Sequence, residues 1–198
     1  PECLLDRGVE QGETLGFIRE LGIGPERFII ELTENQPTYD YNLLREAVTH
    51  YRSMGFKIAI DDLGEGFSSL RLWSELRPEF VKIDMHFIQG INQDPVKLQF
   101  VRSIQEIAQN SESLVIAEGI ETLAELEVIR DLGIACGQGY YIARPHSQPA
   151  TALSAEVSKS LRQRIGHVPR SPLTQRKVTV AKLLRPTSPV SSGTSNNQ

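Results

Sequence analysis

Short apolar runs alternate with longer amphipathic segments over the first three quarters of the chain. Five of these runs end on residues suited to metal, phosphate or water chemistry, and they cover residues 28–31, 57–61, 81–82, 115–118 and 134–138. Short runs with little polar alternation are typical of parallel strands, which are buried on both faces of a sheet. The pattern therefore predicts an α/β domain with a parallel sheet.

The segments between the runs carry apolar residues at helical spacing. They predict helices over residues 41–54, 69–75, 96–109 and 123–132. An open doubly wound sheet would carry a glycine-rich phosphate loop after its first strand, but the turn at residues 33–37 contains no glycine. Polar residues instead end several successive strands, which favours a barrel whose strand ends open on one shared pocket.

Composition narrows the classes of protein. A chain of 198 residues with 39% hydrophobic residues can form one sizeable domain. It contains no run of membrane-spanning length and no signal-peptide pattern. Its two cysteines, Cys3 and Cys136, lack metal-binding spacing and fit a reducing compartment, so we expect a cytoplasmic protein.

Charge divides the chain into two parts. Residues 157–198 hold eight Lys or Arg and no Asp or Glu, whereas residues 1–156 hold 13 basic and 25 acidic residues. The basic part scatters its charges among Pro, Ser and Thr without interleaved aromatics, which favours a solvated linker over a nucleic-acid-binding segment. We predict a domain at 1–155, followed at 156–198 by a linker or the start of a further domain.

Asp61 and Asp62 are adjacent carboxylates at the end of an apolar run and precede the loop at 63–70. Side chains of neighbouring strand residues point to different sides, so Asp61 could bridge two divalent cations while Asp62 completes one coordination sphere. An Asp pair before a glycine is equally consistent with a turn or a helix cap.

Two further carboxylates, Glu31 and Glu118, end strands, and each is followed three residues later by another, Glu34 or Glu121. Glu34 and Glu121 have an alternative role at helix starts, where the macrodipole favours acidic side chains. Lys82 lies within an apolar run and must reach water or pair with anions. Among many carboxylates it should stay protonated, which suits it to hold a water or a phosphate oxygen more than to remove a proton. The alternative is a structural ion pair with Asp84.

Several motifs together resemble the EAL domain, the family of bacterial cyclic di-GMP phosphodiesterases. They occur in order between about residue 1 and residue 148, and they read Glu31-Leu32-Thr33-Glu34, Asp61-Asp62-Leu63-Gly64-Glu65-Gly66-Phe67-Ser68-Ser69-Leu70, Val81-Lys82-Ile83-Asp84, Ala117-Glu118-Gly119-Ile120-Glu121-Thr122, Gln138-Gly139-Tyr140 and Arg144-Pro145. The resemblance implies a modified (β/α)8 TIM-type barrel. It also implies two Mg²⁺ or Mn²⁺ ions and hydrolysis of cyclic di-GMP to linear pGpG.

The resemblance also implies roles for individual residues. Glu31 and Asp61 would bind one metal ion, Asp61 would bridge to the second, and Asp62 would complete the second site with Glu118. Lys82 would hold the attacking water, with Glu121 supporting Lys82.

The remaining roles concern water orientation and the loop beside the metals. Gln138 would orient the water or a metal ligand, and Glu34 would anchor the loop at 62–70. The loop and substrate-proximal positions would be Gly64, Gly66, Ser68 and Pro145. In this loop Leu63 stands where the family usually has Phe, and Glu65 stands where the family often has Thr.

The Glu-Ala-Leu string that names the family does not occur in the 198 residues. The resemblance places this string and an asparagine ligand upstream of residue 1, and it predicts an incomplete barrel lacking roughly its first two strands. We therefore expect the isolated chain to lack part of one metal site and to leave strand edges unpaired.

Three functional interpretations follow. The first is a metal-dependent cyclic di-GMP phosphodiesterase, the second is a cyclic di-GMP receptor without turnover, and the third is an inactive remnant of a truncated gene. The acidic positions named above are all retained, which favours the enzyme over the receptor. The resemblance is compatible with a homodimer and with CBS or GGDEF domains in a parent protein, since residues 177–184 resemble the lead-in to a CBS domain.

Overall fold

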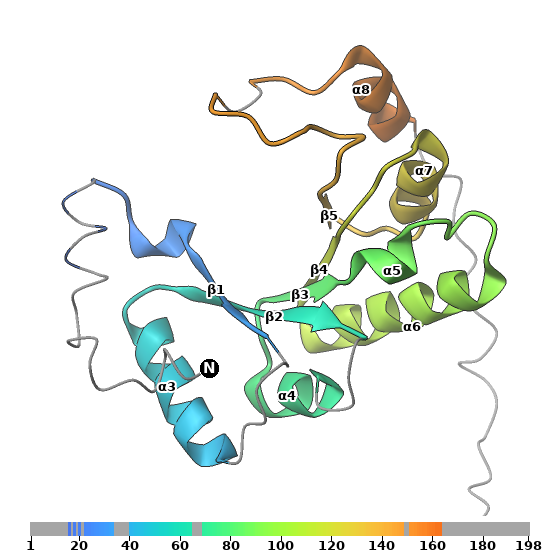
Figure 1. Cartoon of the computed structure of the whole chain (residues 1–198). Coiled ribbons are helices and arrows are strands. Elements are labelled where there is room, and N and C mark those ends of the chain that lie inside the picture. The colour runs from blue at the N-terminus through green and yellow to red at the C-terminus, as the bar shows by residue number, and fades with distance from the viewer. Residues whose placement is uncertain are drawn as a thin grey trace, which may run out of the picture. The chain divides into compact units, whose positions relative to one another are not determined.

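Five parallel strands form one sheet in the order β1-β2-β3-β4-β5. The computed structural model describes residues 16, 18, 20, 22–33, 40–64, 69–148 and 151–163 (Figure 1). The strands are β1 (Ile29–Leu32), β2 (Lys57–Leu63), β3 (Phe80–Ile83), β4 (Leu114–Ala117) and β5 (Cys136–Gly137). Across the described residues this sheet is open, with β1 and β5 at its edges.

Helices connect each strand to the next, and a further helix follows the last strand. They are α3 (Tyr41–Ser53), α4 (Ser69–Leu76), α5 (Met85–Ile88), α6 (Pro95–Ser111), α7 (Leu123–Asp131) and α8 (Ala155–Arg162), with a short 3-10 turn, η1 (Pro25–Arg27), before β1. Helices α3, α4 and α6 cover one face of the sheet (Figure 1). This arrangement confirms the predicted α/β class and parallel sheet.

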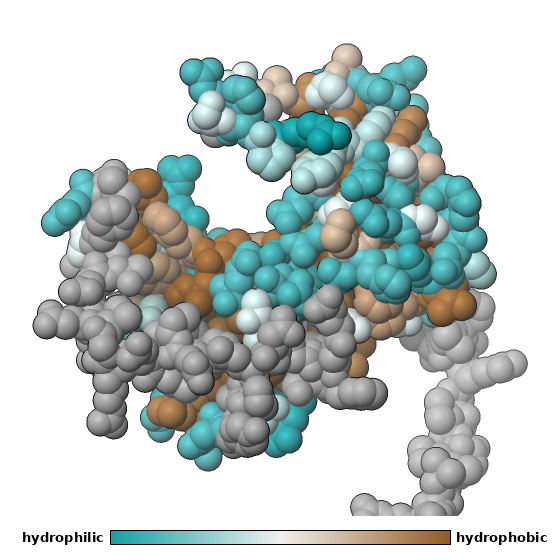
Figure 2. All heavy atoms as spheres, viewed as in Figure 1, coloured by the Kyte–Doolittle hydropathy of each residue, from teal (hydrophilic) through white to brown (hydrophobic). Residues whose placement is uncertain are grey.

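The inner strand β2 and the covering helices share one apolar core. Ile58 and Ile60 on β2 are fully buried, and they pack in the same cluster as Leu44 and Val48 of α3 and Val101 of α6. Burial of each such side chain contributes about 1.5–3 kcal/mol. In the view of Figure 2, hydrophobic residues also reach the surface along β1 and β2, whereas hydrophilic residues cover α5 and α6.

Polar caps start the helices where the sequence changes from strand to helix. The Asp40 carboxylate accepts hydrogen bonds from the amides of Asn42 (2.9 Å) and Leu43 (3.1 Å) at the start of α3. Asp94 caps α6 in the same way, and Pro95 follows it at the first helical position. Such caps contribute about 1 kcal/mol each and fix where each helix begins.

A polar clamp joins α3 to the segments that lead into β2 and β3. The Arg52 guanidinium donates to both carboxylate oxygens of Glu79 and to the carbonyls of Leu76 and Arg77. Glu79 in turn accepts a 2.9 Å hydrogen bond from the amide of Ile58 at the start of β2. The clamp therefore satisfies backbone groups at the amino ends of the strands.

Trp73 of α4 is also anchored near the amino ends of two strands. Its ring is 3% exposed, and its Nε1–H donates to the Ser113 hydroxyl (3.2 Å) just before β4. Ser113 donates to the carbonyl of Pro78 (2.8 Å), just before β3. The indole thus lies at the edge of the sheet opposite the strand carboxyl ends.

Helix α8 packs on the body of the domain through α7. Val157 and Ser160 are buried, and the Arg130 guanidinium donates to the carbonyl (2.9 Å) and hydroxyl (3.1 Å) oxygens of Ser160. No helix among the described residues is long and apolar enough to cross a lipid bilayer.

Candidate metal centre

A β-bulge at the end of β2 places Asp61 and Asp62. Ile60 pairs with Val81 and Leu63 pairs with Ile83, so two aspartates on β2 lie opposite one residue on β3. Asp62 has a left-handed backbone (φ 52°), and its amide donates to the Asp61 carboxylate (3.0 Å). Regular alternation would send the two side chains to opposite faces, but the bulge turns both toward the same site. The expectation that they point to different sides is therefore wrong.

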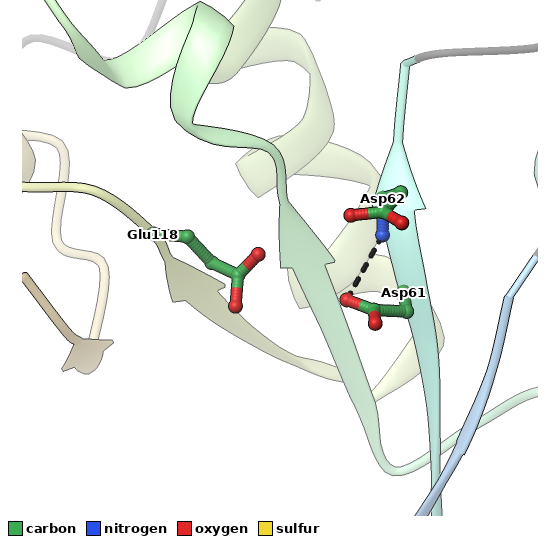
Figure 3. Close-up of side chains that lie close together, drawn as sticks. All are labelled: Asp61, Asp62 and Glu118. Carbon is green, nitrogen blue, oxygen red and sulfur yellow. Dashed lines mark hydrogen bonds between the residues drawn. The ribbon is translucent and has the colours of Figure 1, made fainter.

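Glu118 faces this aspartate pair from the other side of β3, which lies between β2 and β4 in the sheet. It follows β4, and its amide continues the sheet by donating to the carbonyl of Ile83 (3.2 Å). Asp61, Asp62 and Glu118 each offer a carboxylate oxygen within 4.8 Å of the others (Figure 3). Carboxylates from two separate strand ends thus converge, as the sequence predicted.

Lys82 on β3 lies between these carboxylates. Its Nζ is 2.8 Å from Asp61 Oδ1, 2.9 Å from Glu118 Oε1 and 3.1 Å from Glu31 Oε2. The alternative partner, Asp84, instead caps α5 by accepting a 2.7 Å hydrogen bond from the amide of His86. One ammonium group therefore joins carboxylates from the ends of β1, β2 and β4.

The electrostatics follow from this geometry. Burial lowers the pKa of Lys82, but hydrogen bonds to Asp61, Glu118 and Glu31 outweigh burial and raise that pKa well above its ordinary value. Burial raises the pKa of Glu118, and repulsion from Asp61 and Asp62 adds to this, while Lys82 opposes it. Lys82 is thus a permanent cation and cannot serve as a general base at neutral pH.

Gln138 is fixed against Glu118. The Gln138 side-chain amide donates to Glu118 Oε1. Its backbone carbonyl accepts from the amide of Ile120 (3.1 Å), and the amide of Tyr141 donates to the carbonyl of Ile120 (3.0 Å). A Cβ atom at Gly139 would collide with the Ile120 backbone, so glycine is needed for this close approach.

The other predicted positions lie around or outside this cluster. Glu121 is exposed, and among the described residues the carboxylates paired with Lys82 are those of Glu31, Asp61 and Glu118. Gly64 has φ 117° and packs so closely on the Phe87 ring that a side chain there would collide with it. Pro145 is exposed. Glu34, Gly66 and Ser68 lie outside the described residues.

Sequence patterns did not single out Glu125, a buried carboxylate beside this site. It is 5% exposed and forms a capping box with Thr122 at the start of α7. The spacing Thr122-x-x-Glu125 is a signal for such a box and could have identified Glu125.

The donor set fits a hard divalent cation. Asp61, Asp62 and Glu118 offer only carboxylate oxygens, which suit Mg²⁺ and Mn²⁺ better than softer metals. Glu31, 45% exposed, also contacts Lys82 and adds a fourth carboxylate to the cluster. A cluster of four carboxylates with a single ammonium group has an excess of negative charge that a cation would offset.

Comparisons with known proteins agree with this geometry. Residues 3–145 match the model of the EAL domain. The chain is 30% identical over 145 residues to the "Probable cyclic di-GMP phosphodiesterase PdeA" of Escherichia coli, which covers 73% of this chain and 20% of that protein. It is 32% identical over 112 residues to the "Cyclic di-GMP phosphodiesterase TpdA" of Vibrio parahaemolyticus, covering 57% of this chain and 20% of that protein. The chain thus spans about a fifth of the length of these curated relatives.

Solved structures show the same fold. A standalone versatile EAL protein from Vibrio cholerae, in its c-di-GMP-bound form, matches with a TM-score of 0.70 and 30% identity, covering 77% of this chain and 64% of that one. Klebsiella pneumoniae BlrP1, in a manganese and cyclic di-GMP complex, matches with a TM-score of 0.67 and 30% identity, covering 72% and 36%. A parallel sheet with acidic strand ends, the family match and these structures lead to one conclusion: the chain belongs to the EAL domain family.

Proposed function

We propose that this chain carries a divalent-metal-dependent phosphodiesterase site that hydrolyses cyclic di-GMP to linear pGpG. The observation that carries the proposal is the acidic cluster at the strand ends. Lys82 pairs there with Glu31, Asp61 and Glu118, and Asp61, Asp62 and Glu118 lie close enough together to share a cation. The names of the relatives support the choice of substrate, because they include cyclic di-GMP phosphodiesterases and cyclic di-GMP complexes.

The carboxylates are the proposed ligands of two Mg²⁺ or Mn²⁺ ions. Asp61, Asp62 and Glu118 would hold one ion, and Glu31 would share Asp61 with the other. When bound, such ions supply a more acidic water and neutralise charge on the phosphate oxygens. Hydrolysis forms a bond from phosphorus to the water oxygen and breaks the bond from phosphorus to a ribose oxygen, which leaves as a hydroxyl group.

Lys82 and Gln138 are the proposed positioning groups for the reacting water. The Lys82 ammonium carries only donors, so it can hold a water or a phosphate oxygen but cannot accept a proton. Gln138 contacts Glu118 and restrains its carboxylate. The supporting role predicted for Glu121 stays a prediction, as do homodimer formation, further CBS or GGDEF domains and a cytoplasmic location.

The direct test is to incubate the chain with cyclic di-GMP and Mg²⁺ or Mn²⁺ and to separate the products by anion-exchange chromatography. Because the 198 residues contain no Glu-Ala-Leu string, the assay is run both on this chain and with such a segment added before residue 1. We expect pGpG in the extended form, and removal of the metal with a chelator should abolish it.

Asp62→Asn tests the site itself. A neutral amide binds a hard cation poorly, so we expect turnover to fall by at least about 100-fold while the fold is retained. The matched control is Asp131→Asn, which alters an exposed carboxylate on α7. Undiminished turnover in Asp62→Asn would remove Asp62 from the site. Binding of cyclic di-GMP by calorimetry without any product would instead favour a receptor.

A further inference from the structure

Glu125 makes more contacts than a helix cap requires. Its Oε2 accepts hydrogen bonds from the amides of Glu121 (2.9 Å) and Thr122 (3.0 Å), which satisfies the start of α7. Its Oε1 accepts a 2.8 Å hydrogen bond from the amide of Gly90, in the turn between α5 and α6. A capping box needs only the local contacts, so the bond to Gly90 is an additional link across the fold.

Glu125 also holds the loop at residues 118–122, which carries Glu118. The amide of Glu118 donates to β3, that of Ile120 donates to Gln138, and those of Glu121 and Thr122 donate to Glu125. Most amide donors of this loop are therefore held by three different elements. Such a loop has little freedom to move its carboxylate.

Helix α5 approaches this loop directly at its start and is linked to Glu125 of α7 just after its end. Gly119 has φ 70°, and a side chain there would collide with Met85 at the start of α5. Gly90, just after α5, is the donor to Glu125. Since α5 follows the strand that carries Lys82, that strand is tied to the Glu118 loop directly at Gly119 and, through Glu125, at Gly90.

We propose that Glu125 is a positioning residue, which holds the loop at 118–122 and thereby keeps Glu118 against Lys82 and Asp61. It does not touch the reacting atoms. This inference rests on the proposed function only where it concerns metal binding, because the restraint on the loop exists without a cation.

Glu125→Gln separates the cap from the link. The amide keeps one acceptor oxygen, so either Gly90 or the pair Glu121 and Thr122 loses its acceptor. We expect amide exchange in residues 118–122 to become about 10-fold faster, as for loss of a hydrogen bond to a charged group. Exchange of Ile58 and Ile60 in β2 should not change. Glu106→Gln, an exposed position on α6, is the matched control.

Manganese binding is the second readout. Electron paramagnetic resonance of free Mn²⁺ should show an affinity about 10-fold weaker in Glu125→Gln than in Glu106→Gln, the usual effect of losing a partner that orients a ligand. If Glu125→Gln does not fold, Glu125→Asp keeps the charge on a shorter side chain and is measured in the same way.

The outcomes are distinct. Unchanged exchange in the loop would overturn the proposal, and so would equally faster exchange in β2, which indicates a general loss of stability. Faster exchange in the loop with unchanged Mn²⁺ affinity would also overturn it. If the unsubstituted chain bound no Mn²⁺ even in the form extended before residue 1, the proposed function would fail, while loop exchange would still decide whether Glu125 restrains the loop.

Discussion

One ammonium group stabilises three carboxylates in this domain. Lys82 is 10% exposed and contacts Asp61, Glu118 and Glu31 at 2.8–3.1 Å. Without this charge, Asp61 and Glu118, each with a side chain 14% exposed, would lie next to each other with no counterion. Removing one partner of a buried ion pair is more costly than the pair itself is stabilising.

Lys82→Met should therefore destabilise the metal-free domain by about 3 kcal/mol, the low end of the range for breaking a buried ion pair, since Glu31 is nearly half exposed. Urea unfolding measures the change. The control is Lys57→Met, which removes an exposed ammonium near the Phe80 ring. Equal unfolding free energies for the two variants would contradict the structural role of Lys82.

Among the elements, the clamp between α3 and the start of β2 has a predictable response to pH. Burial raises the pKa of Glu79, but hydrogen bonds from the Ile58 amide and from Arg52 outweigh burial and lower this pKa below its ordinary value. A lowered carboxyl pKa in the folded state means that the ionised form stabilises the fold. This stabilisation is present above the unfolded pKa and is lost as the pH falls through the folded pKa.

Glu79→Gln should accordingly cost stability at neutral pH, by no more than about 1 kcal/mol because Glu79 is 39% exposed. The difference from the unsubstituted chain should shrink as the pH falls below the ordinary glutamate pKa of about 4.3 and go on shrinking through the lowered pKa of folded Glu79. Denaturation at a series of pH values tests this. Glu75→Gln, in the exposed pair with Arg45, should show a smaller difference at neutral pH.

Elements defined by a local pattern were predicted well. Strands β3 and β4 begin and end within one residue of the predicted runs at 81–82 and 115–118, and four helices begin at or within one residue of the predicted start, at Tyr41, Ser69, Pro95 and Leu123. Helix α5 was missed because four residues are too few to show a period. Helix α8 was missed because its apolar positions are sparse within a basic and polar segment.

The site was predicted only in part, because some of its features follow from local sequence and others depend on contacts between distant segments. Convergence of Glu31, Asp61, Lys82 and Glu118 follows from their place at strand ends, and the structure brings them together. The bulge at Asp61 and Asp62 could not be predicted, because it depends on how β2 pairs with β3 and not on β2 alone. The link from Glu125 to Gly90 likewise joins residues 35 positions apart.

At the scale of the whole molecule, negative charge dominates. The formal net charge is −4, and the basic residues beyond position 156 leave the first 156 residues more acidic still. Charge of one sign gathered at a single edge of a sheet favours binding of small cations over their free state.

Divalent cations should therefore stabilise the folded chain by mass action, by about 2.7 kcal/mol when the cation is at 100 times its dissociation constant. Thermal unfolding with Mn²⁺ or Mg²⁺, compared with Na⁺ at equal ionic strength, measures this. Asp61→Asn should remove the effect, and Asp131→Asn should retain it. A shift in midpoint that persisted in Asp61→Asn would place the bound cation elsewhere.

The single tryptophan also makes this domain convenient to study by optical methods. Trp73 is the only indole in the 198 residues, and it is enclosed at the edge of the sheet away from the carboxylates. Its emission should be blue-shifted in the folded chain and move to longer wavelength on unfolding. Intrinsic fluorescence can thus report loss of structure without a dye, and substitutions at the acidic cluster should leave the native spectrum unaltered.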